Sequence, residues 1–129
     1  MAISDSRQFS MIAGATFAEA SLYQAVGVNT SGHAVLYGAA LGATGGQGVI
    51  GTLYSVTSTT ASAGNEAVTI GDGPLVKVFM AGSTVAAGDL ITFATADGHG
   101  VVATTNPPYG VVVVGSSGTT GRIFTVKKF

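Results

Sequence analysis

Residues 90–102 read LITFATADGHGVV, and they carry the clearest indication of the fold. Two short runs rich in β-branched and aromatic residues flank Asp97-Gly98, a dipeptide whose residues tolerate the positive φ of a tight turn. Strand-like runs on both sides of such a turn are typical of a β-hairpin. From residue 21 onward the chain repeats this alternation of short apolar runs with Gly, Asn, Asp and Pro. The sequence therefore predicts short β-strands joined by turns.

Nine segments have this composition, and a strand is predicted in each: 21–28, 34–40, 48–56, 66–70, 75–80, 90–95, 100–104, 109–115 and 121–127. Asp72-Gly73 predicts a second tight hairpin turn, for the same reason as Asp97-Gly98. Pro107-Pro108 predicts a connection before the last hairpin, because proline cannot continue a hydrogen-bonded ladder. Nine short strands in about 110 residues predict an all-β fold, a compact barrel or sandwich.

The first 20 residues differ from the rest, with a polar start followed by small apolar residues. We therefore divide the chain into an N-terminal arm, residues 1–20, and a β-barrel domain, residues 21–129. The spacing of Phe17 and Gln24 would allow a short helix, whereas an extended arm fits the composition as well. The apolar residues of the arm are candidate contacts with a neighbouring subunit or another partner: Phe9, Met11, Ile12 and Phe17.

Charged residues make up only 9% of the chain, whereas about 25% is usual in globular proteins. A monomer of this mass exposes roughly 6,000 Å², so each charge would serve on the order of 500 Å² of surface. That area matches the largest apolar patch of a typical monomer. We therefore expect copies of the chain, or a partner, to cover much of the surface. A surface of uncharged Ser, Thr and Gly is the alternative.

Two predicted strands carry apolar residues on both faces. Residues 75–80 read LVKVFM, and alternation places apolar side chains on each side of the strand. Residues 111–114 are four consecutive valines. Such strands are covered on both faces, either by the chain's own core or by another subunit. From them we add Phe79, Val112 and Val114 to the candidate contacts.

The sequence lacks the residue constellations of common catalytic and binding sites. The absence of Cys excludes disulfides, thiolate catalysis and Cys-based zinc sites. The glycine-rich residues 42–48 lack the Lys that follows the glycines of a phosphate-binding loop. His33 and His99 cannot be joined to a full set of metal ligands. We therefore predict no enzymatic activity, no cofactor and no metal.

Nucleic acid and membrane are also excluded as partners. A net charge of −1 does not provide the basic surface that nucleic-acid binding requires. Residues 34–56 are apolar but rich in glycine, and no basic cluster or aromatic belt flanks them, so we do not expect a membrane span. The N-terminal residues contain no apolar segment of signal-peptide length, and we expect no export signal.

A carbohydrate-binding module is the main alternative, because aromatic side chains can stack on sugars. The chain has four Tyr and six Phe but no Trp. All four tyrosines lie in predicted strands, which favours packing in a core or interface. If the alternative holds, Tyr37 and Tyr109 would carry the sugar.

The order of turns and strands resembles a known family of phage proteins. The residues that carry the resemblance are VAAGDLITF at 85–93, DGHGVV at 97–102, YGVVVV at 109–114 and RIFTV at 122–126. This order is similar to that of the small capsid decoration, or cement, proteins of tailed bacteriophages, and the resemblance covers residues 34–126.

The resemblance implies a structural virion protein on the capsid exterior. Such a protein binds the outer surface of the shell and stabilises contacts between major capsid proteins, often as a homotrimer. Its expected partners are the major capsid protein and further copies of itself. The segment AGDLIT at 87–92 also resembles sugar-binding β domains, which keeps a carbohydrate-binding or host-receptor-facing module as the alternative.

Overall fold

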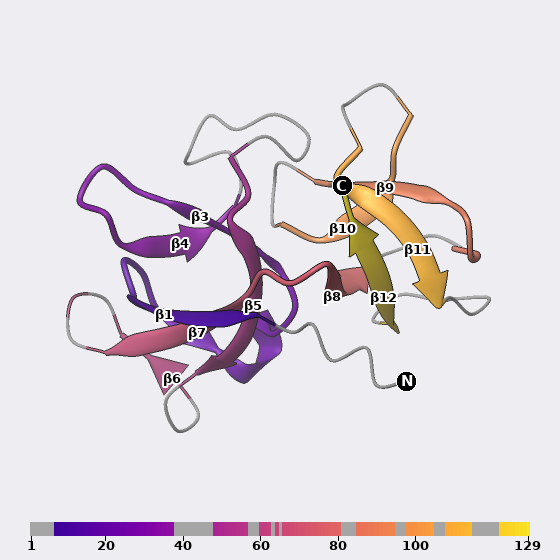
Figure 1. Ribbon diagram of the computed structural model, residues 1–129. Helices are drawn as coiled ribbons and strands as arrows, with labels where there is room; N and C mark the ends of the chain where they lie inside the picture. Colours follow the sequence, from indigo (N-terminus) through magenta and orange to yellow (C-terminus); the bar gives the residue numbers. More distant parts are fainter. Residues whose placement is uncertain are drawn as a thin grey trace.

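The computed structural model describes residues 7–37, 48–56, 60–62, 64, 66–80, 85–94, 98–104, 108–114 and 122–129. Within these residues the chain forms β-strands and one short 3-10 helix, which confirms the predicted all-β fold (Figure 1). No helix in these ranges has the length and apolar character needed to cross a membrane.

The elements follow one another along the chain as β1 (Gln8–Ile12), β2 (Phe17–Ala18), η1 (Glu19–Ser21), β3 (Ala25–Val28), β4 (Ala34–Leu36), β5 (Gly51–Val56), β6 (Thr60–Ala61), β7 (Ala67–Gly71), β8 (Leu75–Met80), β9 (Leu90–Phe93), β10 (Gly100–Val102), β11 (Gly110–Val114) and β12 (Arg122–Lys128). Each of the nine predicted ranges overlaps one strand, which confirms those predictions. The sequence patterns missed β1, β2 and β6.

The first half of the chain builds a five-stranded antiparallel sheet in the order β1-β7-β5-β3-β4. Its two edge strands meet at one corner, where Ala13 forms a parallel bridge with Ala34. Gly14 allows this approach, because a Cβ there would lie 2.9 Å from the Cβ of His33. Strands β2 and β6 form a separate two-stranded ribbon.

The second half forms a closed barrel in the order β10-β8-β12-β11-β9, with β9 pairing back onto β10. Strands β8 and β12 make its longest pairing, from Leu75 opposite Lys127 to Met80 opposite Arg122. Strands β9 and β10 form the predicted hairpin, and Gly98 in its loop has a φ of +73°. Asp97 lies outside the described residues. The barrel stands beside the first sheet (Figure 1).

The turn predicted at Asp72-Gly73 is not a hairpin, so this prediction was wrong. Strand β7 already pairs with β1 and β5, which leaves β8 no free edge beside it. Residues 72–74 therefore carry the chain from the first sheet into the barrel. Composition alone did not distinguish this crossing from a tight turn, because Asp and Gly favour both.

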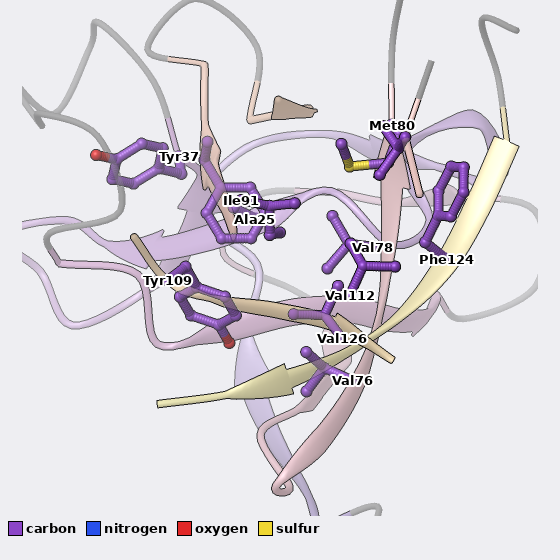
Figure 2. Packing of buried hydrophobic residues seen from close by; sticks show 12 residues of the cluster. Ala25, Tyr37, Val76, Val78, Met80, Ile91, Tyr109, Val112, Phe124 and Val126 are labelled. Atoms are coloured by element: carbon purple, nitrogen blue, oxygen red, sulfur yellow. The ribbon is translucent and has the colours of Figure 1, made fainter. Parts of the chain in front are cut away.

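Two apolar clusters form the interior. The first sheet encloses Ala13, Phe17, Val26, Ala34, Leu53, Ala61, Val68 and Ile70. The barrel encloses Ala25, Tyr37, Val76, Val78, Met80, Val85, Ile91, Phe93, Tyr109, Val112, Phe124 and Val126 (Figure 2). The alternate residues of β8 point inward, as predicted. Two members of the barrel cluster, Ala25 and Tyr37, come from the segment that builds the first sheet.

Residues 8–20, expected to form an arm, contribute β1, β2 and η1. Strand β1 is hydrogen-bonded along its length to β7, from Gln8 opposite Gly71 to Ile12 opposite Ala67. Phe17 is fully buried among the first-sheet residues. A short 3-10 turn, η1, takes the place of the helix considered for this segment. Ala13 also belongs to the first-sheet cluster, so part of this segment serves the core of the sheet.

Candidate interaction surfaces

The exposed edge of β1 holds three of the candidate contacts. Phe9 is 38% exposed and Ile12 is 41% exposed, whereas Met11 packs partly against the first-sheet core. One side of β1 pairs with β7, and among the described strands nothing pairs with its other side between Gln8 and Ile12. An uncharged edge strand with exposed apolar residues is a ready site for association.

The remaining candidate contacts have different positions. Phe17 and Val112 are buried in the chain's own core, so their side chains do not reach a partner. Phe79 is half-buried on the outside of the barrel, where its ring lies 4.9 Å from that of His99. Val114 lies on β11, and its side chain is outside the described residues.

The sugar platform considered at Tyr37 and Tyr109 is not available, because both rings are buried. They lie on either side of Phe93, whose ring centroid is 6.3 Å from Tyr37 and 4.8 Å from Tyr109. This confirms core packing as their role. The Tyr109 hydroxyl has no hydrogen-bond partner among the described residues. Burial raises the pKa of this hydroxyl well above its ordinary value, and the charge of Asp72 raises it further.

The outer face of the barrel carries a second apolar area. Ile123 on β12 is 49% exposed and lies opposite Phe79 on β8. Leu90 and Val113 are also exposed on the neighbouring strands β9 and β11. The predicted valine run is therefore split, since Val112 points into the core and Val113 points out. Alternation along β11 accounts for the exposure of Val113, which follows the buried Val112 and lies at a bulge.

Tyr23, Tyr54 and Lys77 meet on the surface where the first sheet joins the barrel. We call these three residues the tyrosine platform. The two tyrosine rings form an edge-to-face contact, with centroids 6.4 Å apart and planes at 86°. The Lys77 ammonium lies 5.9 Å from the centroid of the Tyr23 ring, a distance at which the cation is attracted to the ring face. Tyr54 remains 38% exposed and Lys77 is exposed.

Two irregularities of the backbone build this platform. Tyr54 lies in a bulge of β5, where the register with β7 shifts between Leu53 and Ser55. Tyr23 has a φ of +67° and is the only described residue other than glycine with a positive φ. Its N–H donates to the carbonyl of Leu53, and its carbonyl accepts from the N–H of Phe79. Tyr23 thus ties the first sheet to the barrel.

Three of the described carboxylates serve local structure. Glu66 accepts a hydrogen bond from the N–H of Ser62 at 2.7 Å, and Asp89 accepts one from the N–H of Ala86 at 2.9 Å. Asp72 forms an ion pair with Lys128. No three His, Asp or Glu side chains among the described residues gather in a way that would hold a metal ion.

His99 and Gln24 join the two halves close to the platform. The two Nε2 atoms of these side chains lie 2.9 Å apart. His33 lies in the connection between β3 and β4, where its N–H donates to the Asn29 side chain. The two histidines therefore take part in separate structural contacts. Residues 42–47 of the glycine-rich stretch lie outside the described residues.

Sequence reasoning did not find the tyrosine platform. Tyr54 was placed correctly in a strand, and alternation puts it on the opposite face from the buried Leu53, but alternation does not show which residues meet it there. Tyr23 was expected within a strand, because no pattern assigns a positive φ to a tyrosine. The contact also depends on the crossing at residues 72–74, which brings β8 beside β5.

Comparison with known proteins gives one informative similarity. No family model matches the chain, and no curated protein sequence matches it. Among solved structures, the chain resembles the N base of head fiber gp8.5 of bacteriophage phi29, with a TM-score of 0.52 and 16% sequence identity. The match covers 95% of this chain and 93% of that one. At this identity the similarity establishes a shared fold.

Proposed function

We propose that this chain is a structural protein of a phage virion that binds the outer surface of the capsid and stabilises contacts between major capsid proteins. The observation that carries the proposal is the fold similarity to the phi29 head-fiber base over nearly the full length of both chains. The order of turns and strands in residues 34–126 points the same way, since it resembles that of phage decoration proteins. The proposed role is non-enzymatic.

The surface of the chain supports this role. A closed barrel protects its strand edges, but in the first sheet no other described strand pairs with the outer side of β1. Soluble monomers usually guard such an edge with Lys, Pro or a bulge, whereas β1 reads QFSMI. We infer that β1 docks on the major capsid protein through its outer edge, which Phe9 flanks on one face of the strand and Ile12 on the other. Many symmetry-related copies then turn modest affinity per site into stable attachment.

Co-sedimentation with expanded capsids of the same phage tests the proposal. The protein is expected to sediment with the shells and to raise the temperature at which they release their contents. Replacing Phe9 and Ile12 together by Asp should reduce the bound fraction at least tenfold. Val28→Asp is the matched control, because Val28 is equally exposed, at 40%, but lies on β3. If the unaltered protein does not sediment with the shells, the proposal is wrong.

Light scattering coupled to size exclusion tests the expected homotrimer. We propose that the apolar outer face of the barrel, with Ile123, Leu90 and Val113, meets further copies of the chain. The mass measured in solution should then be three times that of one chain, and Ile123→Asp should return it to the monomer value. If the protein stays monomeric at high concentration and also when bound to the capsid, this arrangement is wrong.

A further inference from the structure

We propose that the tyrosine platform is a binding site for a saccharide that bears a carboxylate, such as a uronic or sialic acid. This site is separate from the capsid-docking role and does not depend on it. The buried rings of Tyr37 and Tyr109 cannot serve this purpose, but Tyr23, Tyr54 and Lys77 lie on the surface.

The first argument is that the backbone is irregular at both tyrosines. A tyrosine with a φ of +67° lies in the left-handed region, where its Cβ meets a steric cost that a glycine would avoid. The backbone of Tyr23 bridges the two halves, but Gly could make both hydrogen bonds. A second irregularity, a bulge in β5, lies at Tyr54, whose ring meets that of Tyr23. Bulges and strained residues concentrate at binding sites, where they aim side chains.

The second argument is that the Tyr54 ring is held in place although it is exposed. The edge-to-face contact with Tyr23 orients the ring of Tyr54, and Gly71 lies under it, with a Cβ position 3.5 Å from Tyr54 Cδ2. The tyrosine rings therefore have a fixed geometry while Tyr54 keeps 38% of its surface exposed. A ring needed only for packing would be expected to bury more of its apolar area. A preorganised surface ring binds a ligand at a smaller entropic cost.

The third argument is the set of polar groups around the rings. Neither the Tyr23 hydroxyl nor the Tyr54 hydroxyl bonds to another described side chain or backbone group, and each can donate and accept. Within the described part of the chain, Lys77 contacts no carboxylate, so its charge is balanced only by the Tyr23 ring. A pyranose offers an apolar face for a ring and hydroxyls for the phenols. A carboxylate on that sugar would pair with Lys77.

Titration calorimetry with tetragalacturonate tests the site, and its fully methyl-esterified form is the uncharged control. The acidic sugar should bind at least tenfold more tightly than the ester, and 3′-sialyllactose should bind more tightly than lactose. Adding salt should weaken only the acidic ligands, because it screens the ion pair. If both acidic ligands fail to bind, or bind no better than their neutral forms, the proposal is wrong.

Variants locate the binding. Tyr54→Ala should abolish it, Tyr54→Phe should retain part of it, and Lys77→Gln should remove the preference for the acidic sugar. Lys127→Gln and Phe129→Ala are the matched controls, since they remove another exposed Lys and another exposed ring and should change affinity less than twofold. Thermal unfolding confirms that each variant is folded. If Tyr54→Ala instead lowers capsid co-sedimentation and leaves sugar binding unchanged, the platform is a protein contact and the proposal fails.

Discussion

Replacing Gly110 by Ala should weaken the barrel, because the structure has no room for a methyl group at this position. Gly110 begins β11 and pairs on one side with Lys128 and on the other with Ile91. A Cβ here would press against the carbonyl oxygen of Lys127 and would lie 2.7 Å from Val126 Cγ1. Backbone atoms cannot rotate away, so β11 must move relative to β12.

The expected cost follows from that movement. Overpacking a core position costs about 1–3 kcal/mol, and a weakened ladder hydrogen bond adds about 1 kcal/mol. In a closed barrel, a shift away from β12 also crowds β9, so relaxation is limited. We expect Gly110→Ala to lower the free energy of unfolding by about 3 kcal/mol. For a chain of this size that corresponds to a fall in Tm of roughly 10 °C.

Gly71→Ala provides the matched control. Gly71 also lies in a strand, but the nearest atom to its Cβ position is Tyr54 Cδ2 at 3.5 Å, an ordinary contact. Ala here should be neutral or should stabilise the chain by about 0.5 kcal/mol, because it restricts the unfolded state. Thermal unfolding followed by circular dichroism at fixed concentration measures both variants. If the two differ by less than about 1 kcal/mol, the steric reasoning is refuted.

Three further predictions concern buried or paired side chains. Above pH 10 the unfolded state releases the Tyr109 proton while the folded state keeps it, so the free energy of unfolding should fall with rising pH. In urea titrations at alkaline pH, Tyr109→Phe should remove this loss of stability. In chemical denaturation, Phe17→Ala should lower the free energy of unfolding by about 3–5 kcal/mol and Phe9→Ala by less than about 1, because only Phe17 is fully buried. Equal losses would contradict the observed role of residues 8–20 in the sheet. Lys128→Ala should cost less than about 1 kcal/mol, since its ion pair with Asp72 is partly exposed, and a denaturation midpoint well below that of the unaltered chain would show the pair to be more important.

The strands could be predicted from residues 21–129 because their signals are local. Runs such as LVKVFM alternate faces, and turn residues bound them, so each strand required only its own sequence. β1 was missed because it lies in residues 1–20, whose polar start and small apolar residues suggested an arm. Its place in the sheet depends on β7, about 60 residues further along the chain, through a pairing that no local pattern encodes.

The candidate site was harder to predict than the fold. The exposed residues Phe9 and Ile12 could be named from the sequence, because large apolar side chains in a mostly polar segment stand out. Phe17 and Val112 are apolar as well, but they are buried. Only the tertiary pairing of the strands distinguishes these buried residues from the exposed ones. Tyr54 could not be identified as part of a site, since its ring contact with Tyr23 comes from tertiary structure that no local pattern encodes.

The dependence of the barrel core on Ala25 and Tyr37 has a consequence for folding during synthesis. All strands of the first sheet leave the ribosome before any strand of the barrel, so the sheet can form on the nascent chain with its edge strands already paired. Ala25 accepts a hydrogen bond from the N–H of Tyr37, so both side chains lie ready as part of a surface on which β8 to β12 close. The N–H of Ala25 can donate to the carbonyl of Gly98 only once the barrel has formed. A fragment beginning at residue 72 would lack that surface, and we expect it to stay unfolded in solution.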